Sequence, residues 1–128
     1  MKPITIEWVE KAEADFMTIH LQLEAPENPN YDDACFHAQQ CAEKYLKACL
    51  QEYDIPYGKT HNLVVLLDLL IPVRPEGEKL RPLLRVMRAF AVDVRYPGLS
   101  ADREMAEQAL ELCKQVREKI RGSLGLIT

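Results

Sequence analysis

The segment from residue 31 to 53 constrains the fold most, because it is typical of a helix yet carries polar residues along its inward stripe. At about 100° per residue, positions spaced i, i+4, i+7, i+11, i+14 and i+18 share one face of a helix. The residues at these positions are Asp32, Phe36, Gln39, Glu43, Leu46 and Leu50. A buried amide or carboxylate costs about 1–3 kcal/mol unless it is hydrogen-bonded, so Gln39 and Glu43 are expected to find partners on neighbouring helices. Such a polar network either fixes the register of the helices or forms a functional pocket.

The remainder of the chain predicts further helices and no strand. Ala, Leu, Glu, Lys, Arg and Gln are plentiful, and no β-branched run alternates with period two, so the expected fold class is all-α. A chain of 128 residues is expected to form a single domain, 1–128, that needs neither metal nor disulfide. The expected helices cover about 6–23, 31–53 and 60–70. The fourth begins at about Glu78 or Pro82, with its firm part from Pro82, and ends at Val94, and Gly122 and Gly125 close the fifth. The expected N-caps are Thr5, Thr60 and Ser100.

The fourth of these segments combines an apolar surface with a basic stripe. Apolar residues between Val86 and Val94 cover most of its circumference, which predicts the most buried helix of the fold. From residue 74 to 95 there are six basic and three acidic residues, inside a chain whose net charge is −4. The stripe is either an anion site or a solvated face whose arginines pair with acids of another helix. Its members are Arg81, Arg85, Arg88 and Arg95.

Other polar residues allow two interpretations each. Asp15 lies on the apolar seam of the first helix, so it points inward unless that helix is rotated. His61 stands at the first turn of the third helix, where a histidine is more often a surface or capping residue than a ligand. The remaining arc of the second helix is either a solvated face or the lining of a cleft. That arc carries His37, Gln40, Lys44 and Lys47.

Composition excludes several classes of protein. The four cysteines form no C-x-x-C pair, which indicates reduced thiols in the core of a cytoplasmic protein. No apolar run approaches the roughly 18 residues of a membrane span, and the first residues lack the apolar core of a signal peptide, so no membrane partner is expected. The acidic balance argues against a general nucleic-acid coat. There is no Gly-rich phosphate loop, metal-spaced Cys/His set or serine elbow, so we expect no cofactor and no metal site.

Several motifs together carry a resemblance that covers most of the chain. They are Trp8, Ala12 and Asp15, the run Phe36-His37-Ala38-Gln39-Gln40, then Glu43, Lys44, Lys47, Ala48, His61, Leu63 and Leu66, and the turn Arg95-Tyr96-Pro97. On these motifs the chain resembles HEPN-domain proteins of the small prokaryotic kind, which are often paired with a minimal nucleotidyltransferase. The resemblance implies an up-and-down bundle of four to five helices that forms a homodimer, with a cleft for nucleotide or RNA between the protomers.

The resemblance also raises the question of catalysis. Many HEPN members are metal-independent ribonucleases that use an arginine followed, after four to six residues, by a histidine. Counted from Arg95, that histidine would fall at Ser100, Ala101 or Asp102, so the motif is absent and the catalytic residues stay unassigned. A histidine from elsewhere, His37 or His61, could replace it only if the fold brings that side chain to the same phosphate.

The function expected from these observations is a nucleotide- or RNA-binding HEPN subunit that acts with a nucleotidyltransferase partner, in a module of the toxin–antitoxin type. Two alternatives stay open: a divergent metal-independent ribonuclease, and a purely structural dimerisation module. Arg95 ends one helix close to the start of the next, where a guanidinium and free N–H groups can bind one anion together. The residues expected to bind are Arg95, Tyr96, His37, Gln40, Glu43 and Lys44.

Overall fold

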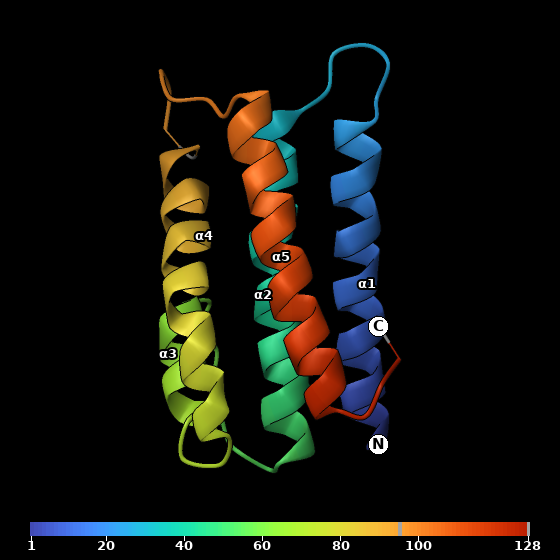
Figure 1. Ribbon diagram of the computed structural model, residues 1–128, viewed down its shortest axis with the longest axis vertical. Coiled ribbons are helices and arrows are strands. Elements are labelled where there is room, and N and C mark those ends of the chain that lie inside the picture. The colour runs from blue at the N-terminus through green and yellow to red at the C-terminus, as the bar shows by residue number, and fades with distance from the viewer. Residues whose placement is uncertain (95, 128) are drawn as a thin grey trace.

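The computed structural model describes residues 1–94 and 96–127, and over these residues the only regular secondary structure is helical (Figure 1). The all-α prediction is therefore confirmed, with five α-helices and one short 3₁₀ helix. None of the described helices is long and apolar enough to cross a membrane. The elements are α1 (Pro3–Leu23), α2 (Tyr31–Glu52), α3 (Leu63–Leu70), η1 (Pro75–Leu80), α4 (Arg81–Asp93) and α5 (Arg103–Ser123).

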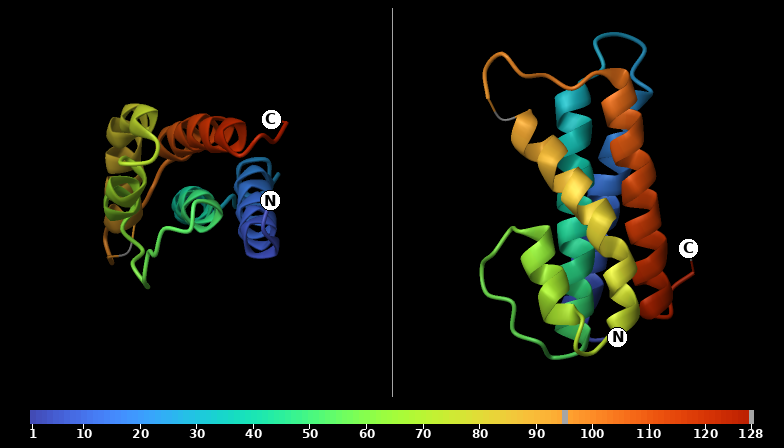
Figure 2. Two further views of the ribbon diagram at one scale, coloured as in Figure 1. Left: turned by 90° about the horizontal axis from the view of Figure 1, so that it is seen from below. Right: turned by 60° about the vertical axis from the view of Figure 1, so that its left-hand side comes forward.

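Helix α2 is the centre of an up-and-down bundle. Seen from below in Figure 2, α2 lies between α1 on one side and α3 with α4 on the other, and α5 covers it from above. Thirteen of its residues are buried, and many of them are alanine or cysteine. Such small side chains let neighbouring helices approach closely, since the distance between helix axes depends on the side chains at the contact. The predicted burial of the seam is confirmed for Gln39, Glu43, Leu46 and Leu50. It is wrong for Phe36, whose side chain is exposed.

The fourth helix is not the most buried one. In α4 only three residues are buried, whereas Ala89 and Val92 face outward. The helix lies at the edge of the bundle (Figure 1), so an apolar circumference did not translate into burial. Its predicted beginning near Pro82 is confirmed to within one residue. The buried residues are Leu84, Met87 and Ala91.

The helices end within one residue of the predicted ends, but α1 begins three residues earlier and α3 three residues later than predicted, and the three predicted N-caps are wrong. Helix α1 begins earlier, after Lys2, because Pro3 needs no hydrogen-bond partner in the first turn. Asn62 caps α3, and its Oδ1 accepts from the backbone N–H groups of Val64 and Val65 at 3.0 and 3.3 Å. Asp102 caps α5 through Met105 N–H at 2.8 Å. In α3 and α5 a residue closer to the first turn than the predicted one supplies the cap, whereas Lys2 before α1 makes no side-chain cap hydrogen bond.

All four cysteines are free and buried, as predicted. Burial raises the pKa of the Cys35 and Cys49 thiols to about 11. The pKa of Cys41 is raised as well, first by its hydrogen bond with Cys113 and then by burial. Since the thiolate is the reactive form, these thiols serve as small apolar side chains of the core.

Candidate functional site

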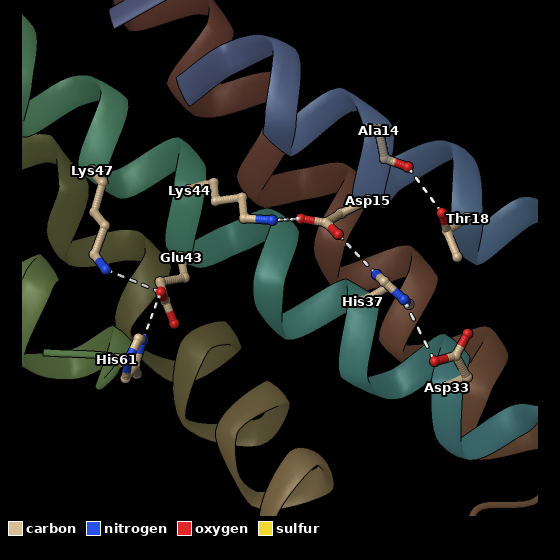
Figure 3. Close-up of polar contacts among 9 residues, drawn as sticks. All are labelled: Ala14, Asp15, Thr18, Asp33, His37, Glu43, Lys44, Lys47 and His61. Atoms are coloured by element: carbon tan, nitrogen blue, oxygen red, sulfur yellow. Dashed lines mark hydrogen bonds and ion pairs between the residues drawn. The ribbon is translucent and has the colours of Figure 1, made fainter. Parts of the chain in front are cut away.

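The first polar cluster of α2 fastens this helix to α1. We call it the Asp15 cluster: Asp15, Asp33, His37 and Lys44 (Figure 3). The buried Asp15 carboxylate accepts from Lys44 Nζ at 2.6 Å and contacts His37 Nδ1 at 2.8 Å. His37 Nε2 lies 3.4 Å from a carboxylate oxygen of Asp33. Both ring nitrogens of His37 therefore face acids, which leaves neither free to accept a proton from a substrate.

The second cluster joins α2 to the connection that precedes α3. This Glu43 cluster consists of Gln39, Glu43, Lys47 and His61, and Figure 3 shows the last three of them. Glu43 is 4% exposed, and its Oε2 accepts from Lys47 Nζ at 3.0 Å and lies 2.9 Å from His61 Nδ1. Lys47 is also buried, with its Nζ 5.5 Å from the centroid of the Trp8 ring. A buried carboxylate is thus held by one lysine and in turn orients one histidine.

The Glu43 cluster leaves polar atoms without a partner. Gln39 Nε2 donates to the backbone carbonyl of His61 at 3.4 Å. Its Oε1, and Oε1 of Glu43, are buried and have no hydrogen-bond partner within the described part of the chain. The partners found for Gln39 and Glu43 come from α2 itself and from the connection before α3, so the expectation of partners on neighbouring helices is wrong.

His61 has the geometry of an oriented base. Its side chain is 77% exposed, whereas its Nδ1 is fixed against Glu43. In the neutral ring that donates from Nδ1, Nε2 carries the free lone pair and can accept a proton. A carboxylate that holds the far nitrogen of a histidine keeps the ring in this tautomer and in a fixed orientation.

A groove runs beside His61 between α3 and α4. Its inner hollow has a volume of about 150 Å³, and an outer hollow of about 300 Å³ adjoins it. The two hollows share Arg88 and Val92, and we call them together the α3–α4 groove. The inner hollow is lined by Gln39, His61, Asn62, Arg88, Ala91 and Val92, and the outer one by Val64, Arg85, Arg88, Ala89, Val92 and Asp93.

The arginine stripe divides into two kinds of residue. Arg81 pairs with Asp68 at 2.8 Å and also with Glu78, as the solvated-face interpretation predicts. Arg85 and Arg88 line the groove, and neither forms an ion pair within residues 1–94 and 96–127. Two positive charges are thus left for an anion from outside the chain. Within residues 1–94 and 96–127 there is also no cluster of His, Cys, Asp or Glu that could hold a metal ion.

The predicted site residues do not meet in one pocket. His37 and Lys44 belong to the Asp15 cluster, and Glu43 belongs to the other. Gln40 lies half-buried on α2 and forms no side-chain hydrogen bond among the described residues. Tyr96 is 60% exposed in the connection 94–102. Arg95 lies outside the described residues.

Two other predictions about polar residues need correction. The solvated-face interpretation of the polar arc is wrong for Lys47, which is 5% exposed. The start of α5 does not follow Arg95 closely, because the helix begins at Arg103. The Asp102 carboxylate already occupies a free N–H group of its first turn. Arg95 itself lies outside the described residues, so its part in an anion site stays a prediction.

Sequence reasoning undervalued His61 and Arg88. The polar position of Gln39 on the seam was the available signal for the groove. The contact between Glu43 and His61 spans 18 residues and depends on the path of the connection 53–62, for which no local pattern exists. Arg88 was one of four arginines on the stripe, and its spacing alone did not separate it from the paired Arg81.

The comparisons with known proteins agree with this architecture. The family model of the HEPN domain matches residues 5–123. The crystal structure of an archaeal HEPN homologue superposes with a TM-score of 0.68 at 23% sequence identity, over 96% of this chain and 98% of that one. No curated protein matches the sequence. Since the family model covers nearly the whole sequence and the crystal structure has the same fold, the chain belongs to the HEPN domain family.

Proposed function

We propose that this protein binds the phosphate groups of a nucleotide or of RNA in the α3–α4 groove, with Arg85 and Arg88 as the cations. The observation that carries the proposal is the pair of arginines without an acidic partner in the described chain, beside the exposed ring of His61. Membership of the HEPN family supports a nucleotide- or RNA-related role.

The chemistry of the groove suits phosphate. A guanidinium presents several N–H donors in a planar fork that matches the oxygens of a phosphate. The chain as a whole carries a charge of −4, so binding depends on this local positive surface and not on general attraction to a polyanion. The affinity should therefore fall with rising salt, by the slope expected for one or two phosphate contacts.

The test is a titration of the protein with ATP and with a short single-stranded RNA at low salt. Arg88→Ala is expected to weaken binding of both about tenfold, because one charge-assisted contact is lost. Arg81→Ala is the matched control on the same helix, since Arg81 already pairs with Asp68 and Glu78. Equal affinities of wild type and Arg88→Ala would refute the proposed site.

The binding residues predicted from the sequence remain part of the proposal, but most of them are assigned other roles than direct contact with phosphate. Glu43 acts by orienting His61, and His37 and Lys44 act by holding α2 against α1. Tyr96 is exposed beyond the end of α4, where its ring can stack on a base of a longer RNA.

Gln40 and Arg95 are further contacts proposed for such an RNA. Arg95→Ala tests the second of them: unchanged affinity for RNA in the same titration would remove Arg95 from the site.

The proposal includes partners. The HEPN resemblance supports a homodimer and a module of the toxin–antitoxin type with a minimal nucleotidyltransferase. Phe36 on α2 lies outside the α3–α4 groove and is 41% exposed, and an apolar side chain of this size suits an interface between protomers. Light scattering tests the dimer, and co-elution with a minimal nucleotidyltransferase tests the second partner. A monomer that does not co-elute would remove both.

A second candidate function is metal-independent cleavage of RNA, and the Glu43–His61 pair beside Arg88 favours it. His61 Nε2 would accept the proton of a ribose 2′-hydroxyl, and the 2′-oxygen would form a bond to phosphorus. The bond from phosphorus to the 5′-oxygen would break, leaving a 2′,3′-cyclic phosphate, and the leaving oxygen would take a proton from water. Arg88 would stabilise the charge that develops on the phosphate.

Cleavage is tested on end-labelled structured RNA without metal. His61→Ala is expected to abolish cutting, whereas His37→Ala is expected to retain it, because both nitrogens of His37 already face acids. RNA that is bound but not cut by the wild type would leave the binding function alone. If neither binding nor cutting occurs, the groove belongs to a structural dimerisation module.

A further inference from the structure

The side chain of Gln39 carries a buried acceptor that faces no donor of the described chain. Gln39 is 7% exposed and lines the inner hollow of the α3–α4 groove. Its Oε1 has no hydrogen-bond partner among the described residues. Folded proteins rarely leave a buried carbonyl oxygen unpaired, because its desolvation is not repaid. A donor from a ligand or from water is therefore expected at this atom.

The orientation of the Gln39 amide is determined by the backbone. Nε2 donates to the carbonyl of His61 at 3.4 Å. A flipped amide would set Oε1 against that carbonyl, and two acceptors would then face each other. The free atom of Gln39 is thus an oxygen that can accept but cannot donate, so it discriminates between a donor and an acceptor on a ligand.

The size and the walls of the inner hollow suit a flat heterocycle. Its volume of about 150 Å³ is half the roughly 300 Å³ at which pockets for drug-sized ligands begin, so it fits a base and not a whole nucleotide. Ala91 and Val92 contribute apolar walls, while the ring of His61 and the guanidinium of Arg88 contribute planar groups on which a base can stack. The outer hollow with Arg85 adjoins it, where the phosphates are proposed to bind.

We infer that the inner hollow holds a nucleobase with an exocyclic amine, which donates to Oε1 of Gln39. Adenine, cytosine and guanine have such an amine, whereas uracil and hypoxanthine have none. The inference rests on the proposed phosphate site and adds base selectivity to it. A base without the amine leaves the buried Oε1 unpaired, and a carbonyl at the same place turns a second acceptor toward it.

The test compares nucleotides that differ in the amine. Calorimetric titration at constant ionic strength pairs ATP with purine riboside triphosphate, GTP with ITP, and CTP with UTP. In at least one pair the amine-bearing member is expected to bind about tenfold more tightly, since one buried acceptor gains a donor. Affinities that agree within about twofold in all three pairs would overturn the inference, and a water molecule would then be the partner of Oε1.

Two variants separate the inference from the function on which it rests. Gln39→Met keeps the length of the side chain without the acceptor, so the preference within the selective pair is expected to fall to about one. Arg81→Ala is the control that keeps the preference. A preference that persists in Gln39→Met would overturn the base site alone. If no nucleotide and no RNA binds, or if Arg88→Ala leaves their affinities unchanged, the phosphate site is overturned together with the base site.

Discussion

Two polar clusters on α2 differ in how completely their groups are paired. Tyr45 and Glu43 lie two residues apart and so point to different sides of the helix. On the Tyr45 side, Glu13 accepts from Arg117 at 2.6 and 2.8 Å and from the Tyr45 hydroxyl at 2.5 Å. Arg121 donates to the same hydroxyl at 3.2 Å. We call Glu13, Tyr45, Arg117 and Arg121 the Glu13 cluster, in which both carboxylate oxygens have partners.

The Glu43 cluster is incomplete by the same measure. One oxygen of Glu43 has two partners and the other has none within the described residues, and the histidine that it orients is mostly exposed. A complete network within the bundle serves the fold, because it links α1, α2 and α5 without a vacant position. A network with free acceptors and an exposed ring is what a ligand site needs before its ligand binds. The difference marks the Glu13 cluster as a closed structural network and the Glu43 cluster as the one that keeps polar groups available.

The largest expected effect on stability comes from removing the carboxylate of Glu43 while its partner Lys47 stays in place. Glu43→Leu leaves the ammonium of Lys47 buried without its carboxylate, which should cost about 3 kcal/mol of unfolding free energy. The double variant Glu43→Leu/Lys47→Met should recover most of that loss, because the charge is removed with its partner. Urea unfolding of both variants measures the difference. If the single variant is as stable as the wild type, Lys47 does not depend on Glu43.

Loss of the carboxylate from the Glu13 cluster should cost less. Glu13→Ala removes the partner of Arg117 and Tyr45, but its side chain is 32% exposed, so water can replace part of the interaction. The expected loss is about 2 kcal/mol in urea unfolding. Glu107→Ala is a matched control, because the exposed Glu107 pairs with Arg103 at 3.1 Å on the surface and its loss should change stability by less than about 0.5 kcal/mol. An equal loss in both variants would mean that the Glu13 cluster contributes no more than a surface ion pair.

The Glu13 cluster should also shape the acid limb of stability. The hydrogen bond from Arg117 lowers the pKa of Glu13 below its ordinary value of 4.5, against the opposing effect of burial. Because the pKa is depressed in the folded state, the stabilisation is complete above about pH 4.5 and is lost as the pH falls through the lower folded value. As the pH falls from 5 to 3, the free energy of unfolding of Glu13→Gln should therefore drop by up to about 1 kcal/mol less than that of the wild type. Parallel pH profiles of the two proteins would exclude this contribution.

The clusters also show how much of the fold and of the candidate site can be predicted from the sequence. A spacing of 3.6 residues predicts which residues of one helix share a face, so the burial of Asp15, Gln39 and Glu43 was predictable. The same spacing does not say which helix is central, and α4 was mistaken for it. The wide apolar circumference of α4 suggested a core position, while the alanines and cysteines of α2 gave the correct signal of close packing.

Contacts between elements were beyond such reasoning. The Glu43–His61 contact depends on the course of the connection 53–62, and the contact of Glu13 with Arg117 spans 104 residues. Helix propensity and capping predict where an element begins and ends, but not which partner a charge finds across the bundle. The resemblance to HEPN proteins supplied the bundle topology that periodicity alone lacks.

The smallest expected change in stability is that of Gln39→Leu, which should stabilise the fold where the other variants destabilise it. It therefore separates the two clusters most directly. Gln39→Leu removes a buried acceptor that has no donor in the described chain, at the cost of one long hydrogen bond of 3.4 Å to the His61 carbonyl. The net change should lie within about 1 kcal/mol and favour the folded state, because an unpaired buried oxygen costs more than a weak bond returns. Tyr45→Phe is the counterpart in the Glu13 cluster, and it should destabilise by about 1 kcal/mol because its hydroxyl is fully used. Thermal melts in which Gln39→Leu is less stable than Tyr45→Phe would mean that Gln39 Oε1 has a hydrogen-bond donor in the folded protein. The inner hollow would then lack the free acceptor on which base recognition depends.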